Sequence, residues 1–122
     1  MSLRCLIVDD NKRFLEVARA SLGDSGLEIV ATATTSEEAL RSVEELQPDV
    51  VLVDIGLGAE SGFDLARALT DTFPRLVSRV VLISTRSEDD YAEMIEGSPA
   101  AGFITKAKLS PRAIRKLVSP GE

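Results

Sequence analysis

Four short apolar runs in this chain each lead directly into a polar or charged residue. The runs at 6–8, 50–53, 80–83 and 102–105 are followed in turn by Asp9 and Asp10, by Asp54, by Ser84 and by Lys106. Such runs are typical of strands buried on both faces of a parallel sheet. Parallel strands end at one edge, where open α/β folds bind ligands, so we expect these side chains to gather there.

Amphipathic stretches alternate with the apolar runs. Residues 11–22 place apolar side chains at helical spacing. Further helices are expected at 35–46, 62–72, 87–96 and 110–118, and a further strand at 27–31. Thr35 and Glu38 have the spacing of a capping box, and Ser110 before a proline is typical of a helix start. The alternation predicts one α/β domain over residues 1–122, with helices on both faces of a parallel sheet.

Composition excludes several classes of function. A chain of 122 residues is long enough to bury a hydrophobic core. Its net charge of −6 means that it is not expected to bind nucleic acid or anionic membranes. The absence of histidine excludes a Ser/His/Asp triad, a histidine zinc site and a histidine phosphocarrier. No membrane-spanning run or secretory signal is present, and the single cysteine, Cys5, lies in an expected strand. We therefore expect a reduced, cytoplasmic protein.

The polar residues at the strand ends suit one kind of chemistry. Three carboxylates, a hydroxyl and an ammonium at one edge fit a hard divalent cation together with a phosphoryl group. Plainer interpretations exist: Asp9 and Asp10 are suited to capping the next helix, and a lysine such as Lys106 is more often solvated. Asp54 and Ser84 are also ordinary strand-end residues. However, carboxylates at adjacent strand ends repel each other without a cation, which favours the functional interpretation.

The order and spacing of these residues resemble the receiver domain of two-component response regulators over essentially the whole chain. The matching positions are the acidic pair Asp9 and Asp10, the phosphoacceptor Asp54, the glycine Gly62, the hydroxyl residue Ser84, the lysine Lys106 and the switch aromatic Phe103. One such match is weak evidence, whereas several in order at consistent spacing are specific. The resemblance implies a flavodoxin-like (βα)5 fold whose doubly wound, five-stranded parallel sheet has the strand order 2-1-3-4-5.

The resemblance also implies a reaction. Asp54 would accept a phosphoryl group from a histidine kinase, and such a domain catalyses only its own phosphorylation and dephosphorylation. Oxygen ligands for Mg²⁺ would come from Asp9, Asp10, Asp54 and the backbone carbonyl of Gly56. Lys106 and the Ser84 hydroxyl would contact the phosphate, which carries a charge of roughly −1.5 to −2.

A conformational switch is implied as well. Ser84 would be drawn toward the phosphate, and Phe103 would turn inward into the space that Ser84 leaves. That movement would repack the face formed by the fourth helix, the fifth strand and the fifth helix. The chain also has an acidic stretch at 88–96 and a basic one at 106–116, which solvated helix faces explain best. The alternative is a two-fold homodimer that pairs the acidic helix of one chain with the basic helix of another.

Some positions depart from the usual pattern of the family. Gly58 stands where proline is common, which predicts a more mobile loop after Asp54. Ala107 replaces the frequent proline after the lysine, so we expect a trans peptide and a shifted Lys106. Gly56 would admit an attacking water, which shortens the lifetime of the phosphoryl group, whereas Arg86 would cover the phosphate and lengthen it. Because the two effects oppose each other, the sequence predicts no lifetime.

The same residues bear on three other functions. The chain would also suit a receiver-like interaction module that works without phosphorylation. A magnesium-dependent aspartyl-phosphate hydrolase would need a second aspartate two residues after Asp54, where Gly56 stands. A flavin-binding relative of the same architecture is disfavoured because an acidic edge repels phosphate without a metal.

Overall fold

The sheet has the predicted architecture. The computed structural model describes residues 3–23 and 27–118. Its main sheet contains β1 (Leu3–Val8), β2 (Leu27–Ala33), β3 (Val50–Asp54), β6 (Val80–Ser84) and β7 (Gly102–Thr105). All neighbouring pairs are parallel, in the order β2-β1-β3-β6-β7. This confirms the expected order 2-1-3-4-5, because these are the first to fifth strands of the βα units.

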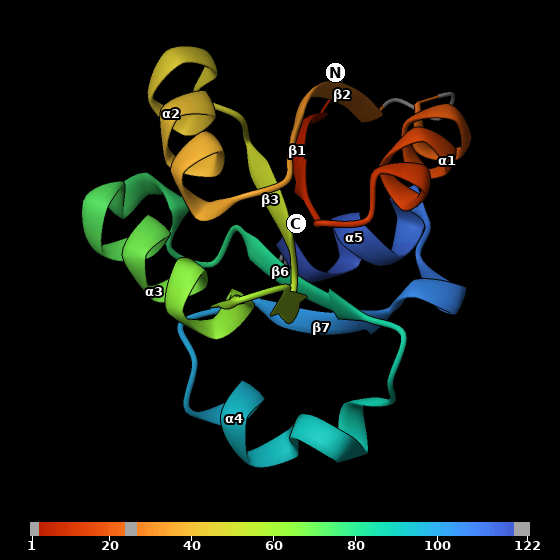
Figure 1. The fold of residues 1–122 in the computed structure, drawn as a ribbon, viewed down its shortest axis with the longest axis vertical. Coiled ribbons are helices and arrows are strands. Elements are labelled where there is room, and N and C mark those ends of the chain that lie inside the picture. The colour runs from red at the N-terminus through yellow and green to blue at the C-terminus, as the bar shows by residue number, and fades with distance from the viewer. Residues whose placement is uncertain (1–2, 24–26, 119–122) are drawn as a thin grey trace.

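Helices cover both faces of the sheet. The α-helices are α1 (Lys12–Leu22), α2 (Ser36–Leu46), α3 (Gly62–Thr72), α4 (Ala92–Glu96) and α5 (Pro111–Val118). Short 3-10 helices follow α3, precede α4 and follow β7, as η1 (Pro74–Leu76), η2 (Glu88–Tyr91) and η3 (Lys106–Lys108). Figure 1 shows α2 and α3 on one side of the sheet and α1 and α5 on the other. The doubly wound arrangement is therefore confirmed.

The two-residue period of the strands divides the core into two clusters. In β1, Leu6 and Val8 pack with side chains of α2 and α3, whereas Cys5 and Ile7 pack with side chains of α1 and α5. All four are fully buried. Both faces of β1 are therefore apolar, which explains why the sequence shows a continuous apolar run rather than an alternating one.

The helix starts follow the predicted local signals. Thr35 Oγ1 accepts a hydrogen bond from Glu38 N at 3.2 Å, and a Glu38 carboxylate oxygen accepts one from Thr34 N at 2.8 Å. The bonds from Thr34 lower the pKa of Glu38. At α5, Ser110 Oγ accepts a hydrogen bond from Ala113 N at 3.1 Å. The Thr35 and Ser110 hydroxyls satisfy amide groups that the first helical turn leaves without intrahelical partners, and Glu38 binds the amide just before the cap.

The predicted helix over 87–96 is wrong in its first half. The Ser87 carbonyl accepts a hydrogen bond from Asp90 N, which makes a 3-10 turn, and α4 begins only at Ala92. Ser87 Oγ bonds the Asp90 carboxylate at 3.4 Å instead of capping a backbone amide. Neither η2 nor α4 has a buried residue, so little packing stabilises a longer α-helix here.

Candidate functional site

The predicted polar residues lie in a row along the carboxyl edge of the sheet. Val8 pairs with Val53, so Asp9 and Asp54 leave neighbouring strands at the same level. Asp54 pairs with Ile83, immediately before Ser84. Ser84 in turn pairs with Thr105, which immediately precedes Lys106. The register therefore brings together four strand ends that are far apart in the chain.

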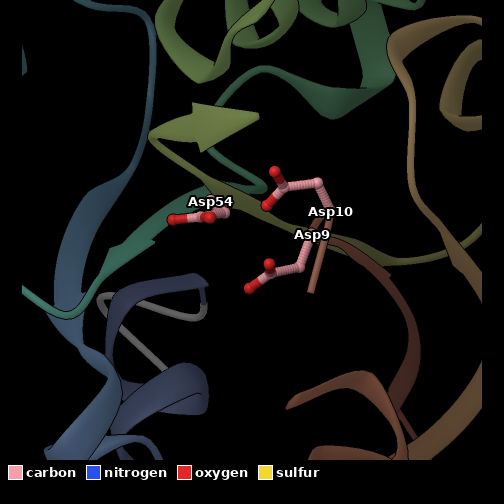
Figure 2. Close-up of side chains that lie close together, drawn as sticks. All are labelled: Asp9, Asp10 and Asp54. Carbon is pink, nitrogen blue, oxygen red and sulfur yellow. The ribbon is translucent and has the colours of Figure 1, made fainter. Parts of the chain in front are cut away.

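Three carboxylates converge at this edge. Figure 2 shows the side chains of Asp9, Asp10 and Asp54 close together, and one oxygen of each lies within 4.8 Å of the others. Asp9 and Asp54 are buried and Asp10 is exposed. The chemistry of this all-oxygen donor set fits a hard divalent cation such as Mg²⁺. Gly56, the fourth predicted ligand, is exposed at the start of the short strand β4 (Gly56–Leu57).

The two oxygens of Asp9 have different environments. Oδ1 accepts a hydrogen bond from Asn11 N at 2.9 Å. Oδ2 accepts no well-oriented hydrogen bond from the described residues and faces the Lys106 ammonium at 2.6 Å. A fully buried carboxylate oxygen with free acceptor capacity fits a cation at this position. Asn11, not Asp9 or Asp10, is the N-cap of α1, so the capping interpretation of the acidic pair is wrong.

Lys106 reaches into the cluster. Its Nζ lies 2.6 Å from Asp9 Oδ2 and 3.7 Å from Asp54 Oδ2, and 13% of its side chain is exposed. Its peptide bond to Ala107 is trans, as expected. One ammonium balances only one of three carboxylates, so the edge keeps a net negative charge and attracts a cation.

The environment of Asp54 disfavours its charge. Burial, followed by the charge of Asp9, raises the pKa of Asp54 from 3.8 to about 6. The Lys106 ammonium and a hydrogen bond from the Gly56 backbone act in the opposite direction, and Asp10 raises the pKa further. Desolvation and like charges thus outweigh the attraction of the lysine.

This raised pKa predicts a pH dependence of stability for the metal-free protein. A carboxyl with a higher pKa in the folded state stabilises the fold fully below about pH 4, and this contribution is lost as pH rises through about 6. We expect the free energy of unfolding of the wild type to fall by about 1–2 kcal/mol over this interval relative to Asp54→Asn, after allowance for solvent screening. Urea unfolding in EDTA at several pH values measures the difference, and a flat difference would contradict the shift.

Ser84 and Phe103, the two residues predicted to form the switch, are both buried. Ser84 is 5% exposed, and its Oγ accepts a hydrogen bond from Arg86 N at 3.1 Å. Phe103 is 9% exposed and belongs to the core cluster on the α2–α3 face. It also lines a cavity of about 400 Å³, together with Ser87, Glu88, Asp89, Ile104, Thr105, Lys108 and Ala113. The hydroxyl and the aromatic ring thus come from neighbouring strands, β6 and β7.

The loop after Asp54 forms a small hairpin that the sequence did not predict. It pairs β4 with β5 (Glu60–Ser61) in antiparallel register. Gly58 in its turn has φ +63°, which favours glycine and which a proline ring cannot adopt. A Glu60 carboxylate oxygen accepts a hydrogen bond from Ser36 N at 3.0 Å, which ties the hairpin to the start of α2.

Sequence reasoning missed one contact of the site. The Nζ of Lys106 lies 4.2 Å from the ring centroid of Phe14. The helical spacing of Phe14 indicated a core residue, and the ring does pack against the cluster on the α1–α5 face. No short motif signals the contact, because Phe14 in α1 and Lys106 at the start of η3 are far apart in the chain and meet only in the folded domain.

The fold and the site define a flavodoxin-like α/β domain with a cluster of carboxylates and a lysine at its carboxyl edge. The chain belongs to the response regulator receiver domain family, whose model matches residues 5–119. Receiver domains of this family act in two-component signalling. Within the described residues, no helix has the length and apolar character needed to cross a membrane.

Individual relatives agree with this assignment. The chain is 33% identical to the response regulator GacA of Pseudomonas viridiflava and 32% identical to the transcriptional regulatory protein KdpE of Mycobacterium tuberculosis. These alignments cover 85% and 83% of the chain but 48% and 43% of the relatives, so the chain spans less than half of their length. The receiver domain of the putative regulator NarL from M. tuberculosis superposes with a TM-score of 0.82 at 27% identity, covering 98% of each chain.

Proposed function

We propose that this chain is a phosphorylation-dependent signalling switch that accepts a phosphoryl group on Asp54. The observation that carries the proposal is the position of Asp54, which is buried beside Asp9, Asp10 and the Lys106 ammonium. Phosphoryl transfer depends on positioning and on neutralisation of the transferring oxygens, and this edge has groups for both. The donor would be the phosphohistidine of a histidine kinase, since this chain has no histidine of its own.

In the transfer, a carboxylate oxygen of Asp54 bonds to phosphorus while the bond from phosphorus to the donor nitrogen breaks. The donor imidazole leaves with the electron pair of that bond. Asp54 is mainly ionised, and therefore nucleophilic, above about pH 6. The Lys106 ammonium and the Ser84 hydroxyl would each bond a phosphoryl oxygen. The domain thereby acts only on itself and on its bound donor.

Mg²⁺ would be held by oxygen ligands from Asp9, Asp10, Asp54 and the backbone carbonyl of Gly56. When bound, it would neutralise charge on the transferring oxygens. The convergence of three carboxylates on this edge and their excess over ammonium groups support this assignment.

The output surface would be the face formed by α4, β7 and α5. The Ser84 hydroxyl would donate to a phosphoryl oxygen, and because its oxygen also accepts a hydrogen bond from Arg86 N, its movement would shift the loop that leads to η2. Phe103 borders both this loop and the neighbouring cavity, so its ring would repack there. The absence of buried residues in η2 and α4 supports a face that rearranges easily.

We further propose that residues 1–122 form a single cytoplasmic receiver domain whose partners are a histidine kinase and a second copy of itself. Residues 1–2, 24–26 and 119–122 lie outside the described residues. The dimer would use the α4–β7–α5 face, where the acidic residues of η2 and α4 would lie opposite the basic residues of η3 and α5.

The proposal is tested by incubating the protein with a small phosphodonor, with and without Mg²⁺, and reading the intact mass. We expect a phosphoryl adduct that requires Mg²⁺ and maps to Asp54. Donor turnover is checked on an active receiver domain in the same buffer. A folded wild type that forms no adduct under these conditions would contradict the proposal and favour an interaction module that works without phosphorylation.

A further inference from the structure

We propose that Phe14 is a positioning residue that holds the Lys106 ammonium at the phosphoacceptor edge. The inference rests on the proposed function, because it assigns Phe14 a role in transfer to Asp54. It depends on the stacking of the ammonium over the aromatic ring, which brings the start of α1 to the end of β7.

The ammonium is held from two sides. Its Nζ lies 4.2 Å from the ring centroid of Phe14, inside the roughly 6 Å range of favourable cation–π contacts. The same Nζ lies 2.6 Å from Asp9 Oδ2. With only 13% of the lysine side chain exposed, water screens neither interaction strongly. The ring therefore provides an attractive surface for the ammonium beside the carboxylates.

Both groups that hold the ammonium belong to one short, hydrogen-bonded segment. Asn11 N donates to Asp9 Oδ1 at 2.9 Å, and Asn11 Oδ1 accepts a hydrogen bond from Phe14 N at 3.1 Å. The cap that begins α1 thus fixes the backbone of Phe14 relative to Asp9. Leu15, the next residue, is buried in the core and anchors the first turn. The position for the ammonium is consequently preorganised.

Lys106 needs such a restraint. Its side chain is long and flexible, and Asp9 attracts the ammonium more closely than Asp54, at 2.6 Å against 3.7 Å. The following residue is Ala107, which does not restrain the backbone as a proline would. A ring that favours the ammonium near both carboxylates keeps it available to a phosphoryl group on Asp54.

The contact itself is tested by NMR on the full chain, labelled with ¹³C-lysine and free of metal. Protons above an aromatic face are shielded, so we expect the Lys106 ε-methylene signal, assigned through Lys106→Arg, to lie upfield of the other lysines. Phe14→Leu should remove this shift while keeping an apolar side chain of similar size. Phe14→Tyr should restore it, and Phe73→Leu, which removes a ring next to η1, should leave it unchanged.

The role in transfer is tested by the initial rate of the Mg²⁺-dependent adduct. We expect Phe14→Leu to slow adduct formation roughly two- to tenfold, with Phe14→Tyr and Phe73→Leu at the wild-type rate. A wild-type rate in Phe14→Leu, or an unshifted Lys106 signal in the wild type, overturns the inference about Phe14 and leaves the proposed function unaffected. A wild type with the shifted signal but no adduct overturns the proposed function, and the transfer role of Phe14 with it.

Discussion

Asp54→Asn is expected to abolish the Mg²⁺-dependent phosphoryl adduct completely. The amide that replaces the carboxylate is neutral and is not a nucleophile toward phosphorus. Asp9 and Asp10 remain in the variant, but we do not expect either of them to replace Asp54 as the phosphoacceptor. The Lys106 ammonium is paired closely with Asp9, and Asp10 is exposed. Intact mass after treatment with a phosphodonor measures the effect.

The same variant provides its own control for folding. Removing one charge from a cluster of three carboxylates relieves like-charge repulsion, so the metal-free variant should unfold at a higher temperature than the wild type at pH 7. Loss of the adduct together with higher stability cannot result from misfolding. Asp71→Asn, which changes an exposed carboxylate in α3, should leave both measurements unchanged. An adduct of undiminished amount in Asp54→Asn would place the phosphoacceptor elsewhere.

Gly62→Ala is expected to destabilise the fold by about 3 kcal/mol or more, which is a large part of the stability of a typical domain. A Cβ at this position would overlap the carbonyl oxygen of Asp54 and lie 2.8 Å from Cα of Ile55. Both obstacles are backbone atoms, and Gly62 N donates a hydrogen bond to Ile55 O at 2.8 Å, so α3 cannot move away without breaking this contact.

Gly56→Ala is the matched control for this prediction. It lies in the same loop, and a Cβ there would meet no atom within 4 Å. We expect its free energy of unfolding to stay within about 1 kcal/mol of the wild type. Chemical denaturation of both variants measures the difference. Equal stabilities of Gly62→Ala and Gly56→Ala would show that the start of α3 is not packed against the end of β3 as described.

Local interactions explain why much of the fold was predictable. The strands that lead to Asp9, Asp54, Ser84 and Lys106 appear as apolar runs because both faces of the sheet are covered. The start of α2 was visible because Thr35 and Glu38 cap it through neighbours in the sequence. The prediction over 87–96 was wrong because a run of polar and acidic residues does not reveal whether an α-helix finds packing partners.

The sequence predicted which residues lie at the candidate site, but it did not predict the contacts between their side chains. Strand-end positions brought Asp9, Asp54 and Lys106 to one edge, since parallel strands end together. Their relative distances depend on side-chain packing across strands. The close approach of Lys106 to Asp9 rather than Asp54 is an example of such a contact.

The sequence by itself determined the order of the strands and helices, the caps, and the set of residues at the carboxyl edge, because periodicity and neighbouring side chains control these features. Only the tertiary structure decided the environment of each group. Burial beside Asp9 raises the pKa of Asp54. Folding brings Phe14 of α1 to Lys106 at the start of η3, so that the aromatic ring lies under the ammonium. Such effects depend on distance and desolvation between residues remote in the chain, and these arise only when the sheet and its helices are assembled.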